Sequence, residues 1–189
     1  MINKYKLILF FTLLLQLKSN GQCVSNQSHS ITPLGPYSPG QIVTVNYTLG
    51  NFIQLNVNWV HAFQINLSSG WINLTPIIQP GNPIGSLGSW TWDLQHTFPS
   101  GLNFGPGWRF TNLSVIDWGT SSNGPFNMSF TIEVAQTCQL DSLSIDINVY
   151  GDCLTGGWNN GACCLDPPYT IYNGVVQVIP VSTSNINHY

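Results

Sequence analysis

Apolar and polar residues alternate with a period of two along much of the chain, which is the pattern of half-buried β-strands. In the run 43–49 the odd positions are apolar and the even positions carry Thr or Asn. The alternation recurs over 57–67, 126–134 and 143–149, and further strands are expected near 30–33, 71–78, 89–96, 108–113 and 170–180. No helical periodicity of useful length interrupts these runs, so the pattern predicts an all-β chain.

Pairs of turn-forming residues separate the strand runs, with Pro-Gly at 39–40 and 80–81 and Asn-Gly at 123–124, 160–161 and 173–174. Eight or nine short strands between such turns predict a two-sheet antiparallel β-sandwich, immunoglobulin-like or jelly-roll-like, with one core. Because the runs at 126–134 and 143–149 follow each other closely, we expect them to form a hairpin. No linker divides residues 22–189, so they are expected to form a single domain.

The first 21 residues have the features of a secretory signal peptide. Lys4 and Lys6 precede an apolar stretch over 7–15, and Ser-Asn-Gly at 19–21 is a small-x-small cleavage site. The apolar stretch is shorter than the roughly 20 residues of a membrane-spanning helix. Cleavage after residue 21 leaves Gln22 ahead of Cys23, which disfavours a lipid anchor on that cysteine. We expect a secreted, extracellular or cell-surface protein with no membrane attachment after leader removal.

Charged residues make up only 6% of the chain, against roughly 25% in an average globular protein. Outside the leader, Arg109 is the only Lys or Arg, and seven acidic residues oppose it, which gives a formal charge of minus six. Binding to nucleic acid or to an anionic membrane requires several cations. The composition therefore excludes nucleic acid as a partner.

The chain has five cysteines, which are Cys23, Cys138, Cys153, Cys163 and Cys164. In an exported chain these are expected to form disulfides rather than a thiolate metal site, and three of them lie in a glycine-rich loop at about 151–168. Five cysteines allow at most two intramolecular bridges and leave one over, which could bond to another chain. The pairing stays open, although a bridge from Cys153 to Cys163 or Cys164 would close a short loop.

Tryptophan is the most unusual side chain, with seven copies. Trp59, Trp90 and Trp92 lie on one face of their predicted strands and are expected to fill the space between the sheets. The tryptophans that adjoin glycines or turn residues are the candidates for exposed, ligand-binding rings, and these are Trp71, Trp108 and Trp158. Such rings stack on sugars, so the expected partners are polysaccharide or other surface proteins.

No catalytic constellation stands out. Asp93 and Asp117 each adjoin a tryptophan and could serve a glycan-cleaving enzyme, but Asp93 lies on the strand face opposite its neighbouring Trp and Asp117 belongs to a turn. His61, between apolar neighbours, is expected to be a core histidine bonded to a backbone carbonyl. Asp152 and Asp166 flank the cysteine loop and are weak candidates for Ca²⁺ ligands. No other metal or cofactor is expected.

Several short motifs occur in a fixed order along the chain. Asn-Trp-Val-His-Ala at 58–62 precedes Ser-Gly-Trp at 69–71, Trp-Thr-Trp at 90–92, Gly-Pro-Gly-Trp-Arg-Phe at 105–110 and Gly-Gly-Trp-Asn at 156–159. In this order they resemble a repeated module of large secreted and surface proteins from gliding bacteria of the Bacteroidota type, except that Ala62 replaces a glycine. The resemblance implies an extracellular β-sandwich of undefined biochemical role and supplies no catalytic residue.

The function expected from the sequence is a secreted or cell-surface structural or adhesive module without catalytic activity. The strand pattern, the leader and the lack of a catalytic motif all favour it. A carbohydrate-binding domain that uses Trp71, Trp108 and Trp158 is the alternative. A glycan-cleaving enzyme that uses Asp93 and Asp117 is the third possibility.

Overall fold

The alternating runs form the strands of a sandwich in the computed structural model, which describes residues 22–53, 58–81, 87–115, 117–136, 142–157, 164 and 166–175. The strands are β1 (Val24–Thr32), β2 (Ile42–Phe52), β3 (Val60–Leu67), β4 (Trp71–Ile78), β5 (Gly88–Asp93), β6 (His96–Thr97), β7 (Asn103–Phe104), β8 (Gly107–Asn112), β9 (Phe126–Val134), β10 (Ser142–Gly151) and β11 (Tyr169–Val175). One short helix, α2 (Asp152–Thr155), follows β10. Within the described ranges, no helix has the length and apolar character to cross a membrane.

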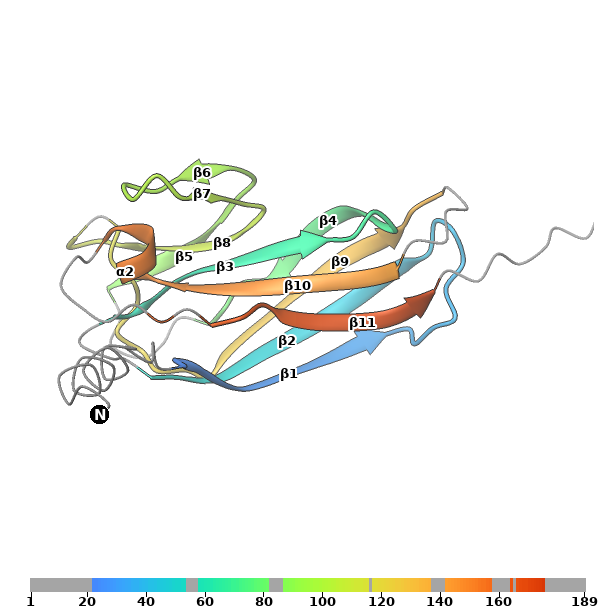
Figure 1. The fold of residues 1–189 in the computed structure, drawn as a ribbon, viewed down its shortest axis with the longest axis horizontal. Coiled ribbons are helices and arrows are strands. Elements are labelled where there is room, and N and C mark those ends of the chain that lie inside the picture. The colour runs from blue at the N-terminus through green and yellow to red at the C-terminus, as the bar shows by residue number, and fades with distance from the viewer. Residues whose placement is uncertain are drawn as a thin grey trace, which may run out of the picture.

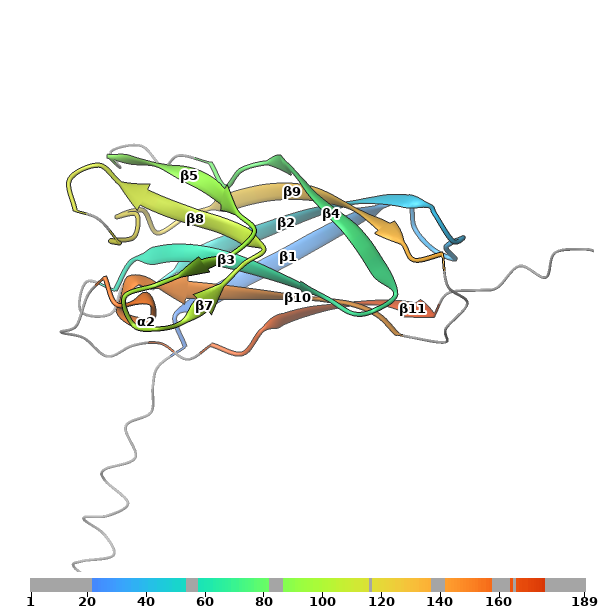
Figure 2. The same cartoon turned by 90° about the horizontal axis from the view of Figure 1, so that it is seen from above.

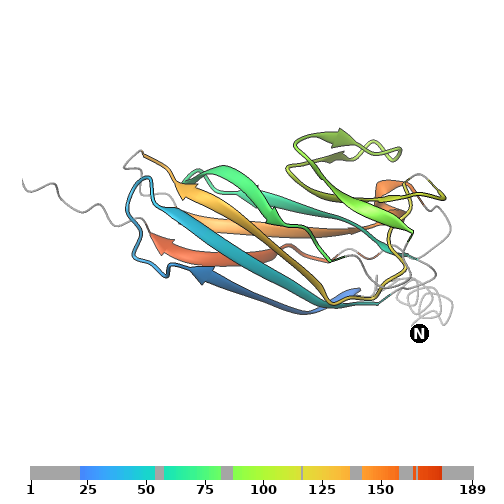
Figure 3. The same cartoon turned by 180° about the vertical axis from the view of Figure 1, so that it is seen from behind.

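Two antiparallel sheets pack face to face (Figure 1). One has the strand order β1-β2-β9-β4 and the other the order β11-β10-β3-β8-β5, and Figure 3 shows the four-stranded sheet from behind. The small hairpin β6-β7 lies on the far side of the five-stranded sheet, above β3 and near α2 (Figures 1 and 2). The predicted all-β antiparallel sandwich is therefore confirmed.

The predicted hairpin between the runs at 126–134 and 143–149 is wrong. These runs are β9 and β10, and β9 pairs with β2 and β4 whereas β10 pairs with β3 and β11. Alternation shows that a strand has one buried face, but the inner faces of both sheets point into the same core. A strand that crosses to the other sheet therefore has the same pattern as one that folds back on its neighbour.

Aromatic rings join the two sheets across the core. Phe63 of β3 and Phe126 of β9 have ring centroids 5.8 Å apart, and Trp90 of β5 contacts these rings at 5.4 Å and 6.0 Å. Burial of each such side chain contributes roughly 1.5–3 kcal/mol to folding. Trp90 thus lies in the core, as the sequence predicts.

A β-bulge interrupts the pairing of β3 with β10. Ala62 lies opposite Tyr150 and Val60 lies opposite Gly151, so His61 is an extra residue without a partner on β10. An extra residue shifts the alternation of faces by one position, so Val60 and Phe63 both pack in the main core. His61 and Ala62 instead pack against residues of α2 and of the segment that contains the β6-β7 hairpin, so residues 60 to 63 are all buried. The bulge ends the regular period of two that the sequence shows over 57–67.

The edge strands β1 and β11 lie side by side and are tied together at one end (Figure 1). Cys23 forms a disulfide with Cys164, with their Cα atoms 5.7 Å apart. The carboxylate of Asp166 accepts hydrogen bonds from the backbone N–H groups of Cys23 and Val24 at 3.1–3.2 Å. These contacts close one side of the sandwich around the first residues after the predicted leader.

The disulfide pairing that the sequence leaves open is thus resolved for one bridge. Cys164 bonds to Cys23, so the short-loop bridge from Cys153 to Cys164 does not form. Cys153 is disulfide-bonded as well, and its partner lies outside the described residues, as do Cys138 and Cys163.

We expect the Cys23→Ser/Cys164→Ser variant to lose about 2–4 kcal/mol of unfolding free energy, because the bridge closes a long loop in the unfolded chain. The two cysteines are 141 residues apart. Urea denaturation followed by tryptophan fluorescence measures the loss. Reduction of both proteins with dithiothreitol is the control for the Cys153 bridge. A loss below about 0.5 kcal/mol, the range of an ordinary surface substitution, would contradict the prediction.

Candidate functional site

A pocket of about 250 Å³ opens at the end of the sandwich where β3 and β5 begin and β8 ends. It is lined by Trp59, Leu87, Asn112, Ser114, Val115, Trp118 and Ser121. These residues come from three segments that lie far apart in the sequence. None of the lining side chains carries a charge, so the pocket combines two indoles with aliphatic, amide and hydroxyl groups.

The two indoles meet edge to face at the wall of the pocket. The ring centroids of Trp59 and Trp118 are 5.5 Å apart and the ring planes are inclined by 70°. Both side chains are half-buried. The sequence predicts Trp59 in the core, which is wrong because this residue precedes β3 and the bulge at His61 breaks the alternation that carried the prediction. The only sequence signal for Trp118 is its place in the turn Asp-Trp-Gly at 117–119.

The buried carboxylate of Asp152 bonds to the backbone beside both tryptophans of the pocket. Asp152 is 0% exposed, and its Oδ1 accepts a hydrogen bond from the backbone N–H of Trp59 at 3.0 Å. Its Oδ2 accepts one from Gly119, the residue after Trp118, at 3.2 Å. Burial raises the pKa of Asp152, and the backbone N–H donors oppose that shift. The relative position of the two tryptophans therefore depends on a side chain that does not line the pocket.

The side chain of Asn58 extends this buried network toward the disulfide. Its Oδ1 accepts the backbone N–H of Cys153 at 3.2 Å, and its Nδ2 donates to the sulfur of Cys164 at 3.5 Å. Asn58 is fully buried. The residue before Trp59 is thus bonded to α2 and to the bridge that anchors β1.

The two weak calcium candidates, Asp152 and Asp166, occupy separate positions in the fold. The oxygens of each carboxylate accept backbone N–H groups, as described above. Among the described residues, the only group of three potential metal ligands is Asp166 with Cys23 and Cys164, whose sulfurs are joined in the disulfide. Both carboxylates are thus engaged by backbone N–H groups, and the calcium site expected from the sequence stays a prediction.

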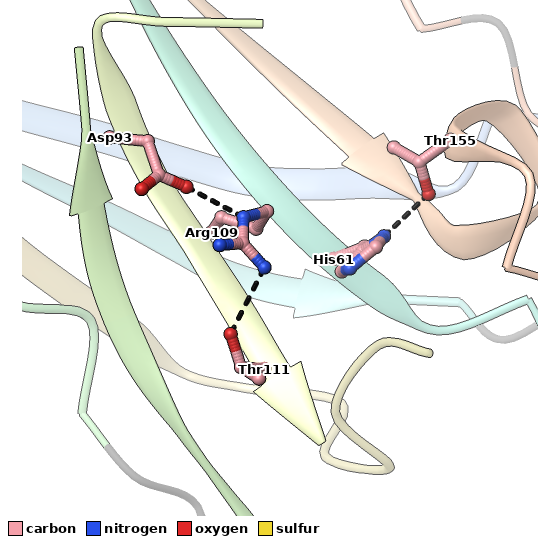
Figure 4. A network of polar contacts seen from close by, with 5 residues as sticks. All are labelled: His61, Asp93, Arg109, Thr111 and Thr155. Atoms are coloured by element: carbon pink, nitrogen blue, oxygen red, sulfur yellow. Dashed lines mark hydrogen bonds and ion pairs between the residues drawn. The ribbon is translucent and has the colours of Figure 1, made fainter. Parts of the chain in front are cut away.

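His61 is a core histidine, as the sequence predicts, and the backbone of Phe110 interacts with its ring and acts against the lowering of its pKa. Its Nδ1 is in hydrogen-bond contact with the Thr155 hydroxyl of α2 (Figure 4). Burial lowers the pKa of His61 to about 3, and the positive charges of Arg109 and His96 add to the shift. His61 is therefore neutral at physiological pH, and it fixes α2 against the bulge.

The two aspartates considered for a glycan-cleaving enzyme lie near opposite ends of β8, because Asp93 pairs with its first residue, Gly107, and Asp117 follows its last residue, Asn112. Asp93 accepts a hydrogen bond from the Arg109 guanidinium at 2.6 Å, and Arg109 also donates to the hydroxyl of Thr111 at 3.1 Å (Figure 4). Asp117 adopts a left-handed backbone conformation with φ of 65° in the turn before Trp118. Asp93 is thus an ion-pair partner on the five-stranded sheet, whereas Asp117 shapes a loop.

Two of the three tryptophans that the sequence suggests as ligand-binding rings, Trp71 and Trp108, are buried. Trp71 is 3% exposed and packs against Tyr37, and Trp108 is 8% exposed and packs against Trp92. The expectation of exposure is wrong for both, because the adjacent glycines allow close packing rather than an open turn. A Cβ at Gly107, for example, would collide with the backbone of Phe63. Trp158 lies outside the described residues.

We expect Asp152→Asn to lower the unfolding free energy by about 1.5–3 kcal/mol, because an amide can accept only one of the two N–H groups and opposes the other with its own N–H. The near-ultraviolet circular dichroism of the tryptophans is expected to change with it. Asp117→Asn makes the same chemical change at a left-handed position that asparagine tolerates, and it serves as the control. Equal unfolding free energies for the two variants would contradict the role of Asp152.

We expect the unfolding free energy to fall as the pH drops from 6.5 toward 3, because the unfolded chain binds a proton at His61 that the folded chain does not. This group contributes a slope of about 1.4 kcal/mol per pH unit. His61→Asn keeps a hydrogen-bonding group toward Thr155 but does not titrate, so its profile is expected to lack that slope. The control is His29→Asn, at an exposed histidine. A His61→Asn profile parallel to the wild type would be evidence against this account.

Comparisons with known proteins identify no family for this chain. No family model matches it, and no curated protein matches it. Among solved structures, it is similar to a DUF4466 family protein from Parabacteroides merdae ATCC 43184, a member of the Bacteroidota, with 14% identity and a TM-score of 0.26. The match covers 81% of this chain and 45% of that chain, so this chain spans less than half the length of that protein.

Proposed function

We propose that this chain is exported and acts as a non-catalytic adhesive or structural module at the cell surface, with the Trp59–Trp118 pocket as its contact site. The predicted leader, the cysteine usage and the resemblance to modules of surface proteins support the location. The pocket, built from three distant segments at one end of the sandwich, is the observation that carries the proposal. Loops at the ends of β-sandwiches are common positions for binding sites.

The bonding of the acidic residues favours a non-catalytic role. Asp93 is paired with Arg109, and Asp152 and Asp166 accept backbone N–H groups. A carboxylate that acts as a general acid or base must reach the substrate. These three side chains instead stabilise the fold.

Exposed apolar side chains surround the pocket and favour a contact role for this end of the molecule. Leu87, Leu113 and Val115 are each more than one-third exposed, and Leu87 and Val115 line the pocket together with the two half-buried tryptophans. Apolar side chains that gather around a hollow are typical of a surface that another molecule covers.

Adhesion of beads coated with the oxidised chain, residues 22–189, tests the proposal. The surfaces are cellulose, chitin, a film of soluble bacterial exopolysaccharide and immobilised casein. We expect wild-type beads to attach to at least one of them and the Trp59→Ala/Trp118→Ala variant to lose about tenfold or more in attachment, the cost of removing an aromatic contact worth about 1.4 kcal/mol.

Tyr172→Ala is the matched control, because Tyr172 is an exposed aromatic residue of β11, outside the pocket lining. Its beads are expected to attach like the wild type. Attachment of the double variant at wild-type strength, or no attachment to any surface, would overturn the proposal. Turnover of a glycan that is lost in Asp93→Asn or Asp117→Asn would overturn its non-catalytic part.

A further inference from the structure

We infer that the Trp59–Trp118 pocket binds one uncharged sugar ring, either a terminal residue or a single unit of a neutral polysaccharide. This inference rests on the proposed function, because it names the ligand class of the same contact site. It follows from four properties of the site, which are its chemistry, its electrostatics, its size and its rigidity.

The lining chemistry matches a sugar ring, which has an apolar C–H face and a polar rim of hydroxyls. Trp59 and Trp118 are inclined by 70°, so the pair offers an aromatic face beside an indole edge. Asn112 supplies an amide whose Oδ1 accepts the backbone N–H groups of Ser114 and Val115 at 2.8 Å and 3.3 Å. Its Nδ2 has no hydrogen-bond partner among the described residues, so it can donate to a ligand hydroxyl.

Electrostatics favours a neutral sugar over an acidic or sulfated one. Arg109 is the only Lys or Arg outside the predicted leader, and it does not line the pocket because its guanidinium is bound to Asp93. An anionic ligand would lose its hydration without gaining a cation in return. Asp117 stands next to Trp118 in the chain and would repel such a ligand further.

The size of the pocket favours a single ring. A volume of about 250 Å³ lies below the range of roughly 300–1,000 Å³ that is typical for drug-sized ligands. A protein partner would need to cover about 800 Å² of this chain, far more than the two tryptophans and their neighbours provide. A small hollow with two aromatic walls fits a compact, amphipathic ring.

Hydrogen bonds within the protein hold Trp59 and Trp118 in position without a ligand. Asp152 bonds the backbone next to each tryptophan, and the backbone N–H of Thr120 donates to the carbonyl of Val60 at 2.8 Å. Loops that are fixed in this way lose little conformational entropy on binding, which is what a weakly interacting ligand such as a neutral sugar requires.

The test is a titration of the oxidised chain followed by tryptophan fluorescence. The neutral probes are the hexasaccharides of cellulose, chitin, xylan, mannan and laminarin, the anionic probes are polygalacturonate and dextran sulfate, and a casein digest represents peptides. Protein from a host without N-glycosylation is used, because Asn112 begins an Asn-Leu-Ser acceptor sequence. We expect saturable binding of at least one neutral probe, with an affinity that does not change with salt.

Two kinds of variant separate loss of binding from loss of folding. Trp118→Ala is expected to weaken binding by about tenfold or more, the factor that corresponds to one aromatic contact. Val115→Trp enlarges an exposed side chain that lines the pocket, so it fills the site without opening a cavity in the core, and it is expected to block binding at an unchanged melting temperature. Tyr172→Ala is expected to bind like the wild type.

The outcomes distinguish this inference from the proposed function. If no neutral probe binds, or if an anionic probe or the peptides bind more tightly, the inference fails, while bead attachment that depends on Trp59 and Trp118 would still support the adhesive module. If bead attachment is lost as well, both fail. Binding of a neutral probe that persists in Val115→Trp would place the sugar elsewhere and would also overturn the inference.

Discussion

The carboxylate of Asp152 is the contact on which the arrangement of the candidate site depends. Because it is fully buried, it requires hydrogen-bond donors, and it finds them in the backbone before β3 and in the loop that contains Trp118. Asn58 adds bonds to Cys153 and to the sulfur of Cys164. One polar cluster therefore connects the start of β3, the helix after β10, the 117–120 loop and the disulfide at β1.

A second polar contact positions the same helix at its last residue, Thr155. The bulge at His61 directs the imidazole to Thr155 of α2, below the β6-β7 hairpin, where Phe98 contacts the histidine ring at a centroid distance of 5.0 Å. Phe98 and Phe104 form a small core of their own with Ala62 on this outer face. The bulge and the hairpin thus bury a face of the five-stranded sheet that would otherwise meet solvent, and α2 is held between two buried polar groups.

Several of the few charged side chains are bonded within the fold. The single arginine outside the predicted leader is bonded to Asp93, and two further aspartates accept backbone N–H groups. Charged side chains therefore organise the fold, while the pocket is lined by aromatic, aliphatic, amide and hydroxyl groups. A ligand of this pocket would therefore be bound without electrostatic steering.

The sequence by itself determined the strands, the antiparallel sandwich class and the use of disulfides, because these follow from local alternation and from the cysteine content. It also placed Trp90 and His61 in the core. The tertiary structure alone decided that β9 and β10 belong to different sheets, that Cys23 bonds to Cys164, and that Trp71 is buried while Trp59 and Trp118 line a pocket. The exposure of a ring depends on what packs over it, and Asp152, which aligns Trp59 with Trp118, is 93 residues away from Trp59 along the chain. No local pattern carries information over that distance.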